Sequence, residues 1–205
     1  MKKLLLAAAL VASFGTAQAD PNLVVNGSFE DGVQGAGSWA VYNSINGWST
    51  ISGSGIEVRN NVAGAAYDGV NYVELDSNDN SAMRQTLGTD IGASYNLSFA
   101  YSARTGVGAA SNPIEVLWNN TSLGVITADG TGLSGNDWHI FNFAVTGTGK
   151  DNLVFRAIGT NDSLGGSLDA VSVTAAVPEP STYAMMFLGL GLIGFNLSRR
   201  RRNAR

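Results

Sequence analysis

Cysteine is absent from the 205 residues, and histidine occurs only once, as His139. The lack of cysteine excludes disulfides, a thiol nucleophile and a zinc–thiolate site. A domain of about 150 residues buries enough apolar surface to fold without such cross-links. Stability must therefore come from an ordinary hydrophobic core.

Sequence patterns of the common catalytic sites are also missing. His139 lies in a predicted strand with no nucleophile beside it, and the chain has no Gly-x-Ser-x-Gly segment. The glycine-rich pieces lack the strand–turn–helix context of a phosphate loop. Acidic residues are plentiful, but no pair is singled out for glycoside hydrolysis. We therefore predict that the protein is not an enzyme, with a glycan-active enzyme as the remote alternative.

The N-terminus has the composition of a secretion signal. Two lysines follow Met1, an apolar run extends from Leu4 to Phe14, and Ala17-Gln18-Ala19 comes next. A basic start, an apolar run and small residues at the cleavage site are the three parts of a signal peptide. The apolar run is short for a membrane span. We predict a signal peptide at residues 1–19, cleaved after Ala19.

The C-terminus contains a second long apolar stretch, which is followed by a cluster of arginines. Pro178, Glu179 and Pro180 precede an apolar stretch at 183–197, and arginines fill most of the last seven positions. This stretch predicts a single short transmembrane helix at 183–197. Arginines stay on the cytoplasmic side of a membrane, so the middle of the chain would face away from the cytoplasm.

The middle of the chain is strongly acidic once both ends are set aside. Residues 20–177 contain five basic and fifteen acidic side chains, a net charge of −10 against −4 for the whole chain. Such a domain should repel nucleic acid and anionic lipid. Divalent cations and neutral sugars are compatible with it.

Alternating apolar and polar residues predict an all-β domain at 20–176. Within 94–102, Tyr95, Leu97, Phe99 and Tyr101 share one face, which is the period of a half-buried strand. About ten short strands separated by turn residues are typical of a two-sheet antiparallel sandwich. The other predicted strands are 23–25, 56–59, 71–75, 82–87, 114–118, 124–127, 138–145, 153–158 and 167–174. In the last of these, strict alternation would put Asp169, Val171 and Val173 on one face.

Residues 177–205 resemble the PEP-CTERM sorting signal, because the Pro-Glu-Pro motif, an apolar span and an arginine cluster occur in that order. The resemblance implies an exosortase-type sorting protease as partner and a transient anchor in the inner membrane. It also implies a final location at the cell surface or outside the cell, in bacteria that make exopolysaccharide.

Residues 22–174 resemble galactose-binding-like jelly rolls, which include carbohydrate-binding modules. The likeness lies in Asn22–Gly32, in Gly47-Trp48 and in the closing segment 162–173. It implies a jelly-roll fold and a non-catalytic role, with polysaccharide as the ligand. The alternative is a purely structural matrix or biofilm protein that has no specific sugar site.

The same resemblance implies one structural Ca²⁺ held by Glu30 and Asp169, because the first and last strands of such folds are neighbours. Calcium prefers carboxylate and carbonyl oxygens. Asp31 is an additional candidate ligand. The alternative is that Glu30 and Asp169 only accept hydrogen bonds from backbone N–H groups of turns.

A second acidic segment, Asp76–Ser81, has the D-x-N-x-N spacing of a calcium loop. Position six is Ser81 where a glycine is expected, and position twelve is Leu87 where a glutamate is needed. A solvated turn rich in Asp and Asn is therefore the favoured interpretation.

Large aromatic side chains are candidates for a sugar-stacking surface. Trp118 ends a predicted strand just before Asn119-Asn120, so we predict that its ring is exposed and binds the ligand. Trp48 is expected in the core, which is the usual place for a large aromatic. Trp39, Tyr42 and Trp138 remain open between the two roles.

Overall fold

The computed structural model describes residues 21–32 and 34–176. The predicted signal peptide, the Pro178-Glu179-Pro180 motif and the predicted membrane span at 183–197 lie outside these residues. Within the described part, no helix is long and apolar enough to cross a membrane.

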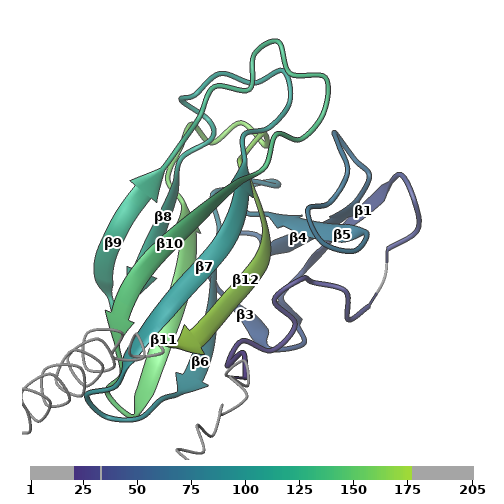
Figure 1. Ribbon diagram of the computed structural model, residues 1–205. Coiled ribbons are helices and arrows are strands. Elements are labelled where there is room, and N and C mark those ends of the chain that lie inside the picture. The colour runs from purple at the N-terminus through teal and green to yellow at the C-terminus, as the bar shows by residue number, and fades with distance from the viewer. Residues whose placement is uncertain (1–20, 33, 177–205) are drawn as a thin grey trace, which may run out of the picture.

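The described chain is a sandwich of two six-stranded antiparallel sheets (Figure 1). The first sheet has the order β1-β4-β5-β12-β7-β10, and the second has the order β2-β3-β6-β11-β8-β9. The strands are β1 (Ser38–Tyr42), β2 (Ser44–Ile45), β3 (Trp48–Ser52), β4 (Ile56–Asn60), β5 (Asn71–Glu74), β6 (Ala82–Gly88), β7 (Ser94–Ser102), β8 (Ile114–Trp118), β9 (Thr121–Ile126), β10 (His139–Thr146), β11 (Lys150–Ala157) and β12 (Ser167–Ala175).

The core lies between the two sheets and follows the predicted alternation. The apolar side chains of β7 point inward, and Leu97 and Phe99 are completely buried. Phe99 stacks on Phe141 and Phe143 of β10, at centroid distances of 5.9 and 6.2 Å. It also meets Phe155 of β11 edge-on at 5.0 Å, which joins the two sheets. Trp48 is 1% exposed in the same core, as expected from the sequence.

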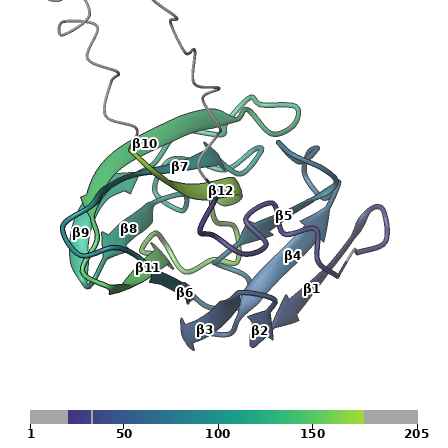
Figure 2. The same ribbon diagram turned by 60° about the horizontal axis from the view of Figure 1, so that its bottom comes forward.

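The first predicted strand, 23–25, is not a strand. This segment is irregular and runs beside β12, where the N–H of Leu23 donates to the carbonyl of Val173 at 2.9 Å (Figure 2). The N–H of Val171 donates in turn to the carbonyl of Gly27. Two backbone bonds are too few for a ladder, but they fix the start of the chain beside the last strand.

A β-bulge changes which way Asp169 points. The register of β12 against β7 shifts between Asp169 and Ser172, and Ala170 has a positive φ of 48°. Leu168, Val171 and Val173 therefore face the core, whereas Asp169 pairs with Ala100 on the outer side of the sheet. The prediction that Asp169 shares a face with Val171 and Val173 is wrong, because the extra residue of a bulge reverses the alternation.

Candidate functional site

The carboxylates of Glu30 and Asp169 both accept hydrogen bonds from the backbone of one loop. The Oδ2 atom of Asp169 accepts hydrogen bonds from the N–H groups of Tyr67 and Asp68, at 2.8 and 3.0 Å. The Oε1 atom of Glu30 accepts from those of Val70 and Asn71, at 2.8 and 2.7 Å. We call residues 67–71 the clamped loop. The structure thus brings Glu30 and Asp169 to the same loop. Both carboxylates accept hydrogen bonds from backbone N–H groups, which is the alternative that the sequence offered to calcium binding.

A tight turn in the backbone positions Glu30 beside this loop. Asn26 and Phe29 have positive φ values of 52° and 59°, so the chain turns tightly just before Glu30. Asn22 anchors the approach, because its Oδ1 accepts from the N–H of Val173 at 2.9 Å. A side chain at Gly27 would collide with the carbonyl oxygen of Val171, so the close approach to β12 requires glycine there.

Burial leaves the charge of Asp169 poorly compensated. The side chain is fully covered, and burial raises the pKa of its carboxyl to about 7, against the N–H bonds from Asp68, Ala170 and Tyr67. The neighbouring charge of Asp68 raises the pKa further. A cation nearby would offset this penalty.

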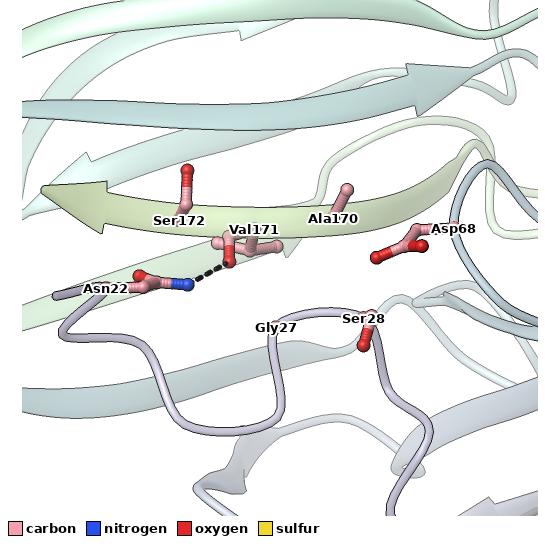
Figure 3. Close-up of a pocket in the computed structure, with 7 residues that line it drawn as sticks. All are labelled: Asn22, Gly27, Ser28, Asp68, Ala170, Val171 and Ser172. Atoms are coloured by element: carbon pink, nitrogen blue, oxygen red, sulfur yellow. Dashed lines mark hydrogen bonds between the residues drawn. The ribbon is translucent and has the colours of Figure 1, made fainter. Parts of the chain in front are cut away.

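A small hollow of about 250 Å³ opens beside the clamped loop. Figure 3 shows that segment 22–28 forms one side of it, β12 forms another, and the Asp68 carboxylate lies near Ala170. Its lining consists of Asn22, Gly27, Ser28, Asp68, Ala170, Val171 and Ser172. Most of these groups are polar, which suits water or an ion better than an apolar ligand.

Three aromatic rings meet at the clamped loop. Trp138 meets Tyr67 edge-on at a centroid distance of 6.4 Å, and it meets Tyr72 edge-on at 5.7 Å. We call Tyr67, Tyr72 and Trp138 the aromatic cluster. Tyr72 is fully buried, whereas Tyr67 is 50% exposed and Trp138 is partly exposed. The indole N–H of Trp138 donates to the carbonyl of Ala65 at 3.0 Å, which fixes the ring.

Sequence reasoning considered Trp138 but missed Tyr67. The loop that contains Tyr67 has no periodicity, and its neighbours are small residues and an Asp-Gly pair. The only available signal was an isolated tyrosine in a turn-rich segment.

The prediction that Trp118 is exposed is wrong. Its side chain is 6% exposed, and its indole N–H donates to the carbonyl of Thr146 at 3.1 Å. It shares the inner face of β8 with Ile114 and Val116, so the alternation of the strand continues to its last residue. The turn begins only at Asn119, which has a positive φ. Trp118 therefore presents no open ring face to a ligand.

A buried charge network lies on the same outer side of the sheet. Arg59 bonds both Glu57 and Glu74, and Arg104 donates to Glu74 at 2.8 Å. Glu57 and Glu74 are 2% and 0% exposed. Burial raises the pKa of Glu74 to about 8, although Arg59 acts in the opposite direction. These carboxylates are covered and paired with guanidinium groups, so they do not form the open pair that glycoside hydrolysis needs.

Residues 176–202 match the PEP-CTERM protein-sorting motif. The predicted resemblance of the tail is thereby confirmed, and Pro178, Glu179 and Pro180 all fall inside the matched range. The chain carries a signal for export and C-terminal membrane-anchoring sorting.

A curated relative matches about three quarters of the chain. The multifunctional-autoprocessing repeats-in-toxin protein of Vibrio vulnificus is 31% identical to this chain over 156 residues. The match covers 74% of this chain and 3% of the toxin, so this chain spans a very small part of the curated relatives that it matches.

Solved structures share the sandwich. The cleaved adhesin domain K1 of Lys-gingipain from Porphyromonas gingivalis has a TM-score of 0.52 and 17% identity, over 68% of this chain and 98% of that one. An arabinose-bound GH51 α-L-arabinofuranosidase also has a TM-score of 0.52, with 13% identity, over 78% of this chain and 27% of that one. A family 35 carbohydrate-binding module from Clostridium thermocellum reaches 0.45, with 17% identity, over 68% and 99%. The two six-stranded antiparallel sheets, together with the two structures at a TM-score of 0.52, confirm the predicted all-β jelly-roll sandwich.

Proposed function

We propose that this protein is exported and that its sandwich binds polysaccharide without catalysis, with the aromatic cluster as the contact surface. The observation that carries the proposal is the exposed Tyr67 ring, held against a fixed Trp138. A sugar ring would stack on the exposed aromatic surface through its C–H groups. The exposed carboxylates of Asp68 and Asp137, each next to a cluster residue, would accept hydrogen bonds from sugar hydroxyls.

The cluster is fixed before any ligand arrives. Asp169 holds the backbone of Tyr67, the carbonyl of Ala65 holds Trp138, and buried Tyr72 packs against the ring of Trp138. Rigid aromatic side chains lose little conformational entropy on binding, so preorganisation favours affinity.

The acidic surface narrows the class of ligand. Residues 21–176 contain five basic and fourteen acidic side chains. A polyanionic polysaccharide would be repelled, so we propose a neutral one.

We also propose that one Ca²⁺ binds beside the clamped loop. The donor types fit, because Glu30 and Asp169 both contact the clamped loop, and the Oδ1 atom of Asn71 in that loop is buried and has no hydrogen-bond donor among the described residues. Glu30, Asp169 and Asn71 would hold the ion, and backbone carbonyls would complete its shell. Bound calcium would stiffen the loop that carries Tyr67.

The sorting motif supports the proposed location. An exosortase would process the tail at the inner membrane, after which the domain would reach the cell surface or the extracellular matrix. We propose exopolysaccharide as the glycan that the domain meets there.

A structural role in a matrix is the second candidate, and one observation favours it. The outer face is largely exposed over 94–98 of β7 and 142–146 of β10, where it carries small side chains, with Asn96 beside Asn142. Such a surface offers weak, distributed contacts and no aromatic platform.

The test is a pull-down of the full-length chain in detergent with insoluble neutral polysaccharides and with native exopolysaccharide. We expect saturable binding that falls at least tenfold in Trp138→Ala and Tyr67→Ala. Trp39→Ala is the matched control, because Trp39 is 52% exposed on edge strand β1 and lies outside the cluster. It should bind as the wild type does.

Two further measurements separate the candidates. Binding that weakens in EDTA and returns with Ca²⁺ would support the calcium proposal, and the variants Glu30→Gln and Asp169→Asn should lose this dependence. If the folded protein binds no polysaccharide, the sugar proposal is wrong and the structural role takes its place.

A further inference from the structure

The Asp76–Asn80 segment forms a tight turn between β5 and β6. Asp76 and Asn80 make an isolated antiparallel bridge, and the N–H of Ser81 closes the turn on the carbonyl of Leu75 at 2.7 Å. Residues paired across an antiparallel bridge project their side chains to the same side, with Cβ atoms about 5 Å apart. The side chains of Asp76 and Asn80 are therefore neighbours.

Both side chains reach the same second loop, at 159–165. The Oδ2 atom of Asp76 accepts from the N–H of Asp162 at 3.2 Å, and the Nδ2 of Asn80 donates to the carbonyl of Gly159 at 2.8 Å. These bonds fix the orientation of the two groups. The remaining oxygens, Oδ1 of Asp76 and Oδ1 of Asn80, are buried and have no donor among the described residues.

Two neighbouring buried acceptors without a donor are costly, because each has lost its water and gained nothing in return. Asp76 is completely covered, and none of the ion pairs in the described part of the chain includes it. The site therefore has acceptor oxygens and excess negative charge, which a cation would balance.

We propose that the Oδ1 atoms of Asp76 and Asn80 are ligands of a hard divalent cation, Ca²⁺ by the type of donor, distinct from the ion proposed at Glu30 and Asp169. No three acidic or histidine side chains gather into a metal cluster in residues 21–32 and 34–176, so this ion would take carbonyl oxygens of the 159–165 loop and water as its other ligands. These ligands come from two loops. The site therefore differs from a single calcium-binding loop, which the sequence excludes because Ser81 and Leu87 stand where glycine and glutamate are needed. The inference does not depend on sugar binding.

One water molecule that donates both hydrogens would also satisfy the two oxygens. The two occupants differ in their response to calcium, which an experiment can measure directly.

The first measurement is isothermal titration calorimetry of the calcium-depleted full-length chain in detergent with CaCl₂. We expect Asp76→Asn to bind one Ca²⁺ fewer than the wild type, or to bind it at least tenfold more weakly. Asp79→Asn is the matched control, because Asp79 lies in the same turn but is exposed. An Asp169→Asn chain that still loses one Ca²⁺ when Asp76→Asn is added would show that the two sites are separate. Equal stoichiometry and affinity in Asp76→Asn and the wild type would overturn the proposal.

A second variant covers the case in which Asp76→Asn does not fold. Asn80→Asp keeps an oxygen ligand and adds a negative charge beside Asp76. At an ion site, its Tm in EDTA should fall below that of the wild type, and Ca²⁺ should raise it by more than it raises the wild-type Tm. If Ca²⁺ shifts both Tm values equally, a water molecule fills the space and the proposal is wrong.

Discussion

The outer face of the first sheet differs sharply between its two halves. On β4 and β5, Glu57, Arg59, Tyr72 and Glu74 are each at most 4% exposed, although they alternate with core residues as solvent-facing side chains do. On β7 and β10, the corresponding outward residues, such as Asn96 and Asn142, are exposed. The same period-two pattern has thus produced a second buried layer in one half and an open surface in the other.

Loops account for the difference. The carbonyl of Val62 accepts from the hydroxyl of Tyr72, and the carbonyl of Ala63 accepts from the hydroxyl of Thr105 at 2.9 Å. The chain between β4 and β5 is thereby fastened over the outer face, together with the start of the loop after β7. Burial on this half depends on loop contacts, which strand periodicity does not encode.

Breaking the charge network of the covered half should have the largest effect. Arg59→Met would leave Glu57 and Glu74 buried without the guanidinium that joins them, at a cost of about 3–5 kcal/mol in the free energy of unfolding. The matched control is Arg156→Met, because Arg156 pairs with Glu115 at the surface and its side chain is 48% exposed. That change should cost about 0–1 kcal/mol. Urea denaturation measures both, and equal losses would contradict the comparison.

The next largest effect should be the pH dependence that Asp169 contributes to stability. Its folded-state pKa of about 7 lies above the usual 3.8 of aspartate, so the folded protein holds this proton to a higher pH than the unfolded chain does. The stability that Asp169 contributes is therefore fully present at low pH and is lost as pH rises through about 7. In EDTA, between pH 5 and 8, we expect this group to lower the free energy of unfolding by about 1–3 kcal/mol.

Urea unfolding of the wild type and Asp169→Asn at each pH isolates this contribution, since all other groups are shared. In EDTA, the difference in the free energy of unfolding between the wild type and Asp169→Asn should change with pH. When Ca²⁺ is added, this pH dependence should become smaller. A constant difference across the range would show that the carboxyl of Asp169 does not titrate there.

The same contrast explains what the sequence could predict. The core face of β7 followed directly from alternation, and so did the fold class. Asp169 was assigned to the wrong face, because a single extra residue at Ala170 shifts the register and leaves no mark on the pattern. Strands β1, β2 and β3 were missed, because β1 has four apolar residues in a row without alternation, β2 has only two residues, and serine and threonine separate the apolar residues of β3.

The candidate site was only partly predictable, for a related reason. Glu30 and Asp169 were found together through the resemblance of the two chain ends to known jelly rolls. Tyr67 was not, because its place depends on a loop whose conformation is set by N–H bonds to those distant carboxylates. Trp118 was placed correctly at the end of its strand, but its ring was predicted to be exposed, whereas it lies on the inner face with Ile114 and Val116.

The open half should respond least to mutation. Asn142→Ala removes an exposed amide whose contact with Asn96 is 3.5 Å long, so the free energy of unfolding should change by less than about 0.5 kcal/mol. Polysaccharide binding should also be unchanged if the ligand lies on the aromatic cluster, because no cluster residue belongs to this surface. A pull-down with Asn142→Ala beside Trp138→Ala therefore compares the two halves directly. Loss of binding in the Asn142 variant alone would move the ligand to the open face, where small polar side chains on a flat sheet would have to replace aromatic stacking.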